Sequence, residues 1–201
     1  MFEKRATTQV PINDVLDRRW SGRAFDPDRK PSRRQLVALL EAARWAPSCF
    51  GDEPWRYIVC ARETNPEAWQ NALACLSEGN QAWAGSAPVL MLAVSSLAFS
   101  GNGKPNRWAQ YDTGAASMSL VTQATDLGLM AHQMGGFDAG RAKQMFSIPQ
   151  DHEPMAMIAV GYQLPREAIP EALLERELAP RRRRPLGENF FDGIWGEPVR
   201  N

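Results

Sequence analysis

The sequence predicts one domain that combines helices with a β-sheet, and two segments decide this fold class. Residues 87–94 are almost continuously apolar, which is typical of a central strand covered on both faces. Residues 112–128 show a helical pattern without any Lys or Arg, so this helix has no face suited to water. A chain of 201 residues can bury roughly 70% of its unfolded surface. We therefore expect a single domain over residues 1–201, with a loose or partner-draped arm at residues 1–10.

Small residues crowd the first half of the central helix at 112–128, and larger apolar residues follow. Asp112 suits the positive N-terminal end of a helix, and Gly128 suits the left-handed position after a helix C-terminus. Such a helix is either the spine of the core or the surface that meets a second copy of the chain across a dimer axis.

Periodicity and capping residues predict the other elements in order. Ser32 and Gln35 match a capping box that starts one helix, and Asn65 with Pro66 starts another. Asp138 can cap a further helix. Helices are expected at 11–19, 32–45, 65–79 (ending near Gly79) and 173–178, and strands at 55–60, 87–94, 129–133 and 154–162.

Charge and composition limit the classes of function. Lys plus Arg and Asp plus Glu both number 23, so the net charge of +0 gives no general argument for a nucleic-acid or membrane partner. No apolar run could span a bilayer and the first residues do not resemble a signal peptide, so a cytoplasmic protein is expected. The three cysteines and two histidines lack the spacing of disulfides, metal sites or a catalytic triad.

Two loops have the composition of binding sites. Arg19, Ser21 and Arg23 lie within five residues, and two guanidinium groups with a hydroxyl suit a phosphate or a planar anion. Charge alone favours the alternative of a solvated surface cluster. Residues 48–54 are too polar for a core but are fixed between a helix and a strand, as site loops often are. Cys49 lacks a nearby basic activator, which favours an ordinary thiol over a nucleophile.

The segment at 99–111 has the composition of a mobile lid. It combines Gly101, Gly103 and a proline with the aromatic residues Phe99, Trp108 and Tyr111. Its GNGK run resembles a phosphate loop only superficially, because the spacing and the following residues differ. We expect the aromatic residues of this lid to select the substrate.

Paired glycines and an arginine run give two more candidates. Gly135 and Gly136 follow a strand, where a ligand can approach backbone N–H groups; a plain turn capped by Asp138 explains them equally well. Four arginines at 181–184 lie between two prolines, and aromatic residues follow. This tail is therefore expected to be docked, and phosphate is a better guess than nucleic acid for its ligand.

Taken in order, these pieces resemble the FMN-dependent nitroreductase superfamily over nearly the whole chain. The matching motifs are Arg-x-Ser-x-Arg-x-Phe at 19–25, Ala-Pro-Ser to Pro-Trp at 46–55, Asn80, the central helix, Gly-Phe-Asp at 136–138 and Arg-x-Arg-x-Pro-Leu at 181–186. The resemblance implies an α+β fold, a three-layer α/β/α sandwich with a mixed, mainly antiparallel sheet around a buried central helix. It also implies a homodimer with two FMN sites at its interface, with the terminal arms wrapped onto the partner.

The resemblance also implies how the two ends of the flavin are held. Arg19, Arg181 and Arg183 would hold the FMN phosphate, with a serine hydroxyl nearby. Arg23 and Asn80 would lie at the pyrimidine edge of the ring. Reduced flavin carries negative charge at that edge, so a fixed cation there stabilises the reduced form.

Two other segments would complete the implied site. The Gly136 N–H would point at flavin N5, and residues 47–49 of the partner subunit would cover the ring. The family often has Asn at Gly51 and Gln at Glu53, and a carboxylate near the flavin would lower its potential unless a cation neutralises it. The cofactor-binding residues implied are Arg19, Trp20, Ser21, Arg23, Pro47, Ser48, Cys49, Gly51, Glu53, Asn80, Met134, Gly135, Gly136, Arg181 and Arg183. The substrate residues implied are Phe99, Trp108 and Tyr111.

The function implied is an NAD(P)H-dependent FMN oxidoreductase. It would pass hydride from NAD(P)H through flavin N5 to a small acceptor, such as a nitroaromatic, quinone or enone, by a ping-pong mechanism that needs no metal or protein nucleophile. A specialised flavin enzyme acting on one metabolite, or on flavin without NAD(P)H, is the first alternative. A non-enzymatic protein that uses the arginine tail to bind nucleic acid or a partner is the second, and the zero net charge argues against it.

Overall fold

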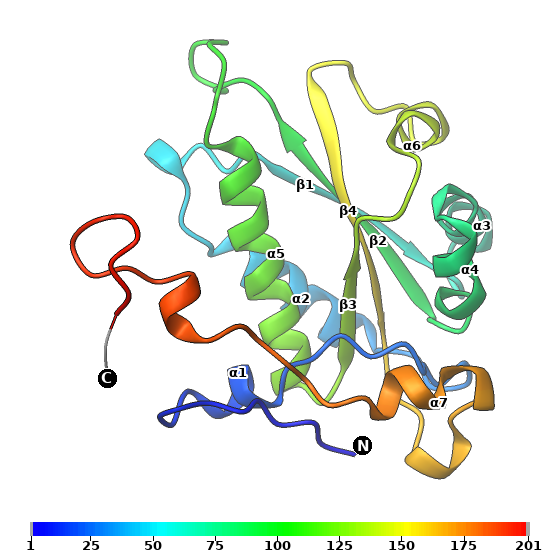
Figure 1. Cartoon of the computed structure of the whole chain (residues 1–201). Coiled ribbons are helices and arrows are strands. Elements are labelled where there is room, and N and C mark those ends of the chain that lie inside the picture. The colour runs from blue at the N-terminus through cyan, green and yellow to red at the C-terminus, as the bar shows by residue number, and fades with distance from the viewer. Residues whose placement is uncertain (1, 200–201) are drawn as a thin grey trace.

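A four-stranded antiparallel sheet organises residues 2–199, the part of the chain that the computed structural model describes (Figure 1). The strand order is β1-β2-β4-β3. The strands are β1 (Trp55–Ala61), β2 (Val89–Ser96), β3 (Met130–Met134) and β4 (His152–Gly161). The helices are α1 (Asp14–Arg18), α2 (Arg33–Arg44), α3 (Pro66–Cys75), α4 (Glu78–Ala84), α5 (Ala109–Asp126), α6 (Ala139–Met145) and α7 (Glu171–Leu178).

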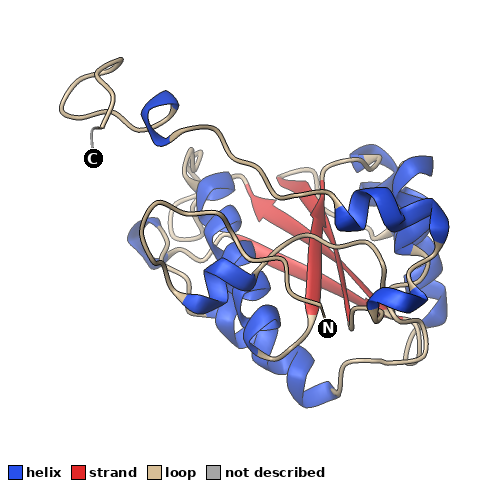
Figure 2. Cartoon of the chain, turned by 60° about the horizontal axis from the view of Figure 1, so that its bottom comes forward, coloured by secondary structure: helices blue, strands red, loops and turns tan. Residues whose placement is uncertain are grey.

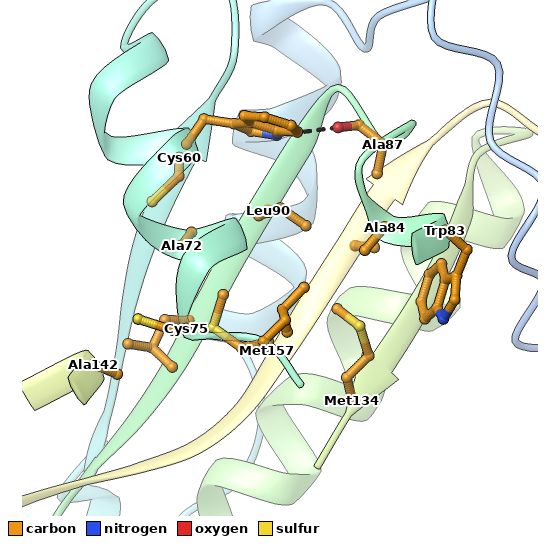
Figure 3. Packing of buried hydrophobic residues seen from close by; sticks show 14 of the residues in the cluster. Cys60, Ala72, Cys75, Trp83, Ala84, Ala87, Leu90, Met134, Ala142 and Met157 are labelled. Atoms are coloured by element: carbon orange, nitrogen blue, oxygen red, sulfur yellow. Dashed lines mark hydrogen bonds between the residues drawn. The ribbon is translucent and has the colours of Figure 1, made fainter. Parts of the chain in front are cut away.

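The two faces of the sheet support two separate cores. Alternate residues of β2 belong to opposite cores, as expected for a central strand covered on both sides. The β2 residues that pack with α2 and α5 are Val89, Met91 and Ala93, and those that pack with α3 and α4 are Leu90, Leu92 and Val94. Figure 3 shows the second core, where the Trp69 indole N–H donates to the Ala87 carbonyl at 3.1 Å. The α+β sandwich is confirmed.

Local capping signals in the sequence have the expected geometry. The Ser32 hydroxyl accepts from the Gln35 N–H, and the Gln35 side chain accepts in return from the Ser32 N–H. The side chains of Asn65 and Asp138 cap α3 and α6. Gly128 adopts a φ of 71° just after α5, a conformation that favours glycine.

The single helix expected at 65–79 is wrong, because α3 and α4 are separate helices. The backbone between them pairs with the segment after β3 instead of continuing a helix. The Asp138 N–H donates to the Cys75 carbonyl at 2.8 Å, and the Ser77 N–H donates to the Gly136 carbonyl at 2.9 Å. This pairing brings the twin-glycine segment against the start of α4.

The central helix α5 has one face that this chain does not cover, so burial on every side is wrong for the single chain. Tyr111 is 78% exposed and Met118 is 40% exposed. Gly114 lies between them at helical spacing and is also exposed. The helix begins earlier than expected, at Ala109, and places Asp112 in its first turn. An exposed stripe of small and apolar residues remains.

The sheet and the N-terminal arm also differ from what the sequence predicted. All strand pairings within residues 2–199 are antiparallel, so no parallel pair makes the sheet mixed within this chain. Residues 2–6 are not a loose arm, because Lys4 Nζ donates to the Glu177 carbonyl at 2.7 Å and the Ala6 N–H donates to the Asp17 carbonyl at 3.0 Å.

The tail after α7 is not docked on its own sheet. Figure 2 shows it running away from the rest of the fold. Arg181 at its start is bonded to the carbonyls of Lys4 and Asp17, but further along the tail folds back on itself through the pairing of Phe191 with Pro198, and Trp195 is 91% exposed. No helix within residues 2–199 has the length and apolar character that crossing a bilayer requires.

Candidate functional site

Three arginines from distant parts of the sequence gather near one another. Arg19 follows α1, whereas Arg181 and Arg183 follow α7. Burial lowers the pKa of Arg19, and the positive charges of Arg181 and Arg183 lower it further. Among residues 2–199, none of the three forms a salt bridge. Neighbouring guanidinium groups without a carboxylate partner suit a multiply charged anion such as phosphate.

Backbone carbonyls of the N-terminal segment and of α1 hold Arg181 in place. The Arg181 guanidinium donates to the carbonyls of Lys4 and Asp17, at 2.5 and 2.6 Å. Arg19 Nη1 lies 3.4 Å from Ser21 Oγ. The structure thus brings together the predicted phosphate residues, which we call the arginine end: Arg19, Ser21, Arg181 and Arg183. The N-terminal segment supports it, which the sequence did not indicate.

A second pair of predicted residues, Asn80 and Gly136, are direct neighbours. Asn80 Nδ2 donates to the Gly136 carbonyl at 3.0 Å. A Cβ at Gly136 would lie 2.8 Å from Asn80 Nδ2, whereas a Cβ at Gly135 would meet nothing within 4 Å. Only Gly136 therefore needs to lack a side chain. Met134, also predicted to bind the cofactor, is 3% exposed and packs in the core.

Arg23 belongs to an aromatic group that sequence reasoning only partly identified. Its guanidinium carbon lies 5.8 Å from the centroid of Trp83, whose ring packs at 4.6 Å against that of His132. His132 Nδ1 lies 3.0 Å from the Gly22 carbonyl, which can only accept, so Nδ1 carries the proton. Burial, together with the positive charges of Arg23 and Arg19, lowers the pKa of His132 to about 4. His132 is therefore neutral at pH 7, and its spacing in the sequence gave no sign of this position.

The loop at 47–53, which contains the predicted ring-covering residues 47–49, lies apart from these residues. Figure 1 shows it beside the N-terminal end of α5, on the face of the sheet opposite α4. The Cys49 N–H donates to Asp112 Oδ2 at 3.0 Å, and the Glu53 N–H donates to Ser48 Oγ at 3.1 Å. No hydrogen bond within residues 2–199 joins this loop to the arginine end or to Asn80 and Gly136.

The loop is bonded instead to the predicted lid. Asp52 Oδ1 accepts from the Ser100 N–H at 2.9 Å and from its hydroxyl at 2.7 Å, and these bonds hold the pKa of Asp52 below its usual value. Phe50, 94% exposed with a φ of 56°, packs edge-on against Phe99 at 6.0 Å. Between the two segments is a hollow of about 330 Å³, lined by Phe50, Gly51, Asp52, Phe99, Ser100, Gly101 and Asn102.

The remaining predicted residues lie outside these groups. Trp20 packs against Phe2 with ring centroids 5.7 Å apart, and Lys4 Nζ lies 4.3 Å from its centroid. Trp108 and Tyr111 are exposed at the start of α5 and do not line the hollow beside the lid. Within residues 2–199 no group of three metal-ligating side chains occurs, and the three cysteines are free.

Comparison with known proteins decides the family. A family model described as the Nitroreductase family matches residues 16–162. The chain belongs to the Nitroreductase family. In this nitroreductase-family chain, Arg181 and Arg183 lie beyond the matched region, so their place in the site rests on their geometry around Arg19.

Solved and curated relatives agree with this assignment. A crystal structure of an oxidoreductase containing FMN superposes with a TM-score of 0.86 at 34% identity, covering 95% of this chain and 96% of that one. An uncharacterized 15.4 kDa protein of Mycolicibacterium smegmatis is 35% identical over 72% of this chain and 99% of its own length. A putative NAD(P)H nitroreductase of Staphylococcus haemolyticus is 25% identical over 78% of this chain and 90% of its own.

Proposed function

We propose that this nitroreductase-family chain is an FMN oxidoreductase that takes hydride from NAD(P)H and reduces a small acceptor. The observation that carries the proposal is the arginine end, where Arg19, Arg181 and Arg183 converge without carboxylate partners. The similar structure of an oxidoreductase containing FMN supports the cofactor, and the similar putative NAD(P)H nitroreductase supports the electron donor. A nitroaromatic, quinone or enone fits the acceptor class.

The residues present fit FMN at both ends of the molecule. The arginine end would hold the phosphate, and Arg23 and Asn80 would meet the polar edge of the ring. Gly136 lets Asn80 lie directly against its backbone, because a Cβ there would collide with the Asn80 side chain. When bound, FMN supplies the hydride chemistry that no side chain can provide. The protein's part is to hold, orient and electrostatically tune that group.

We further propose that a second copy of the chain completes each site. The loop at 47–53 would then cover a flavin held by the partner's arginine end. Two exposed apolar surfaces support this arrangement, one on α5 around Tyr111 and Met118 and one on the tail around Phe190 and Trp195. Large exposed apolar surfaces commonly mark interfaces, and a homodimer with two-fold symmetry would use the same surfaces on both copies.

Flavin reduction tests the proposal directly. The protein is saturated with FMN, freed of excess and titrated anaerobically with NADPH and then with NADH while its visible spectrum is followed. We expect bound flavin whose absorbance bleaches with at least one donor. Bound flavin that neither donor bleaches would favour an enzyme specialised for another reductant. A preparation that retains no flavin would contradict the proposal and return attention to a binding role for the arginine tail.

A further inference from the structure

A buried carboxylate, Glu177, lies directly behind the predicted flavin-binding segment. It is the only acidic side chain within residues 2–199 with no exposed surface. Its Oε1 accepts from the Arg23 N–H at 2.7 Å. Its Oε2 is buried without a hydrogen-bond partner among the described residues. Burying a carboxylate in this way is costly, so its position calls for a physical reason.

Glu177 and His132 hold the same peptide group from opposite sides. The carbonyl of that peptide belongs to Gly22 and accepts from His132 on β3, while its N–H belongs to Arg23 and donates to Glu177 on α7. Gly22 has no room for a side chain, since a Cβ there would lie 2.2 Å from Met130 Sδ and 3.2 Å from Glu177 Oε2. The backbone that carries the Arg23 side chain is therefore fixed in orientation.

Two cationic side chains, Lys4 and Arg23, act on Glu177. Lys4 Nζ donates to the Glu177 carbonyl, and the charges of Lys4 and Arg23 favour the ionised carboxylate, whereas burial raises its pKa. Arg181 donates to the Lys4 carbonyl, so the same network continues to the arginine end. Glu177 thus places a carboxyl group among the cations that would act on the flavin.

We propose that Glu177 is a positioning residue for the bound flavin: it fixes Arg23 through its backbone, and its charge lowers the reduction potential that the surrounding cations would raise. The inference rests on the proposed function. Its physical basis is that a cation near the pyrimidine edge favours reduced flavin, so an anion behind that cation weakens the effect. A carboxylate with a purely structural role would leave the potential unchanged when replaced by its amide.

The test compares E177Q with E175Q, in full-length protein loaded with FMN. E177Q keeps an oxygen that can accept from the Arg23 N–H but removes the charge. E175Q removes the same charge from an exposed position on the same helix. We expect E177Q to favour binding of reduced over oxidised flavin by about tenfold more than the wild type, a positive shift of about 30 mV for a two-electron couple. E175Q is expected to match the wild type.

A second variant, E177D, tests positioning separately. It keeps the charge but draws the carboxylate back by one methylene, so we expect FMN to bind several-fold more weakly, as measured by flavin fluorescence. If E177Q does not fold, wild-type FMN affinity in E177D would overturn the proposal. Equal potentials in wild type, E177Q and E175Q would also overturn it while leaving the proposed function intact. A wild-type chain that retains no FMN would overturn both.

Discussion

The arginine end and the loop at 47–53 differ in the segments of the chain that they contact. The arginine end is assembled within one chain, with the N-terminal segment, the residues after α1 and the residues after α7 held together by backbone carbonyls. The loop at 47–53 is hydrogen-bonded to the N-terminal end of α5, to Arg56 of β1 and to the lid. One chain therefore carries the two predicted parts of the flavin site on separate surfaces, which is the arrangement expected if the site is shared between two copies.

The largest effect is expected at the arginine end. Arg183→Ala removes a guanidinium whose only hydrogen bond within the described residues is to the Arg182 carbonyl, so the fold should tolerate it. We expect FMN affinity to fall by about 10- to 100-fold, because a charge-assisted hydrogen bond is worth about 1.5–3 kcal/mol. Arg184→Ala is the neighbouring control. Equal weakening in both variants, measured by quenching of FMN fluorescence, would show that only general positive charge matters.

The pH dependence of stability tests the buried position of His132 near Arg23. The pKa of His132 is lowered to about 4 from 6.5, so between these values the unfolded chain binds more protons than the folded one. Stability is complete above pH 6.5 and should fall by up to about 3 kcal/mol as pH falls toward 4. The pKa of Glu177 is raised, so the contribution of Glu177 to stability decreases as pH rises above the usual pKa of a glutamate. Urea unfolding at pH 7.5 and pH 5 should show a smaller loss in His132→Gln; an equal loss would contradict this account.

Gly135 and Gly136 allow a matched pair of variants beside Asn80, where the flavin ring is proposed to bind. Gly136→Ala places a Cβ 2.8 Å from Asn80 Nδ2 and 3.0 Å from Ser77 Oγ, so Asn80 must move. We expect unfolding free energy to drop by about 1–3 kcal/mol and FMN affinity to fall by roughly tenfold. Gly135→Ala should change neither, because its Cβ would meet nothing within 4 Å. A larger loss of stability and FMN affinity in Gly135→Ala than in Gly136→Ala, measured by urea and FMN titrations, would contradict the conclusion that only Gly136 must lack a side chain.

The smallest effect is expected where the loop meets the lid. Asp52→Ala removes the acceptor of both Ser100 hydrogen bonds and frees the two segments from each other. We expect kcat/KM for the acceptor to fall about two- to fivefold while FMN affinity stays unchanged. Asn102→Ala, which alters a bond within the lid only, is the control. A loss of FMN in Asp52→Ala would contradict this expectation and show that flavin binding depends on the contact between the loop and the lid.

Sequence reasoning succeeded where a feature depends on local chemistry. The capping roles of Ser32 and Asn65 and the left-handed conformation of Gly128 follow from side-chain type and backbone sterics alone. The apolar pattern of β2 likewise predicted a strand covered on both faces. The fold class and family resemblance were confirmed by the match over residues 16–162.

Features that depend on distant partners were missed. The break between α3 and α4 depends on pairing with Gly136 and Asp138, some 60 residues away. The residue at the break is Leu76, which is not a helix-breaking residue such as glycine or proline. Glu177 looks like part of a solvated helix face in the sequence, and only the packing of α7 behind Arg23 buries it. The site residues transferred by resemblance stay predictions, although the structure brings several of them together.

Complementation between two inactive variants tests the shared site most directly. Phe50→Glu places a carboxylate on the most exposed residue of the loop, and Arg183→Glu reverses a charge of the arginine end. The two variants are co-expressed with different tags, and heterodimers carrying both tags are purified. In a shared site each heterodimer has one site with both parts intact, so we predict about half of wild-type NAD(P)H-dependent activity per dimer. Activity no higher than the mean of the two separate variants would contradict a site built from two copies.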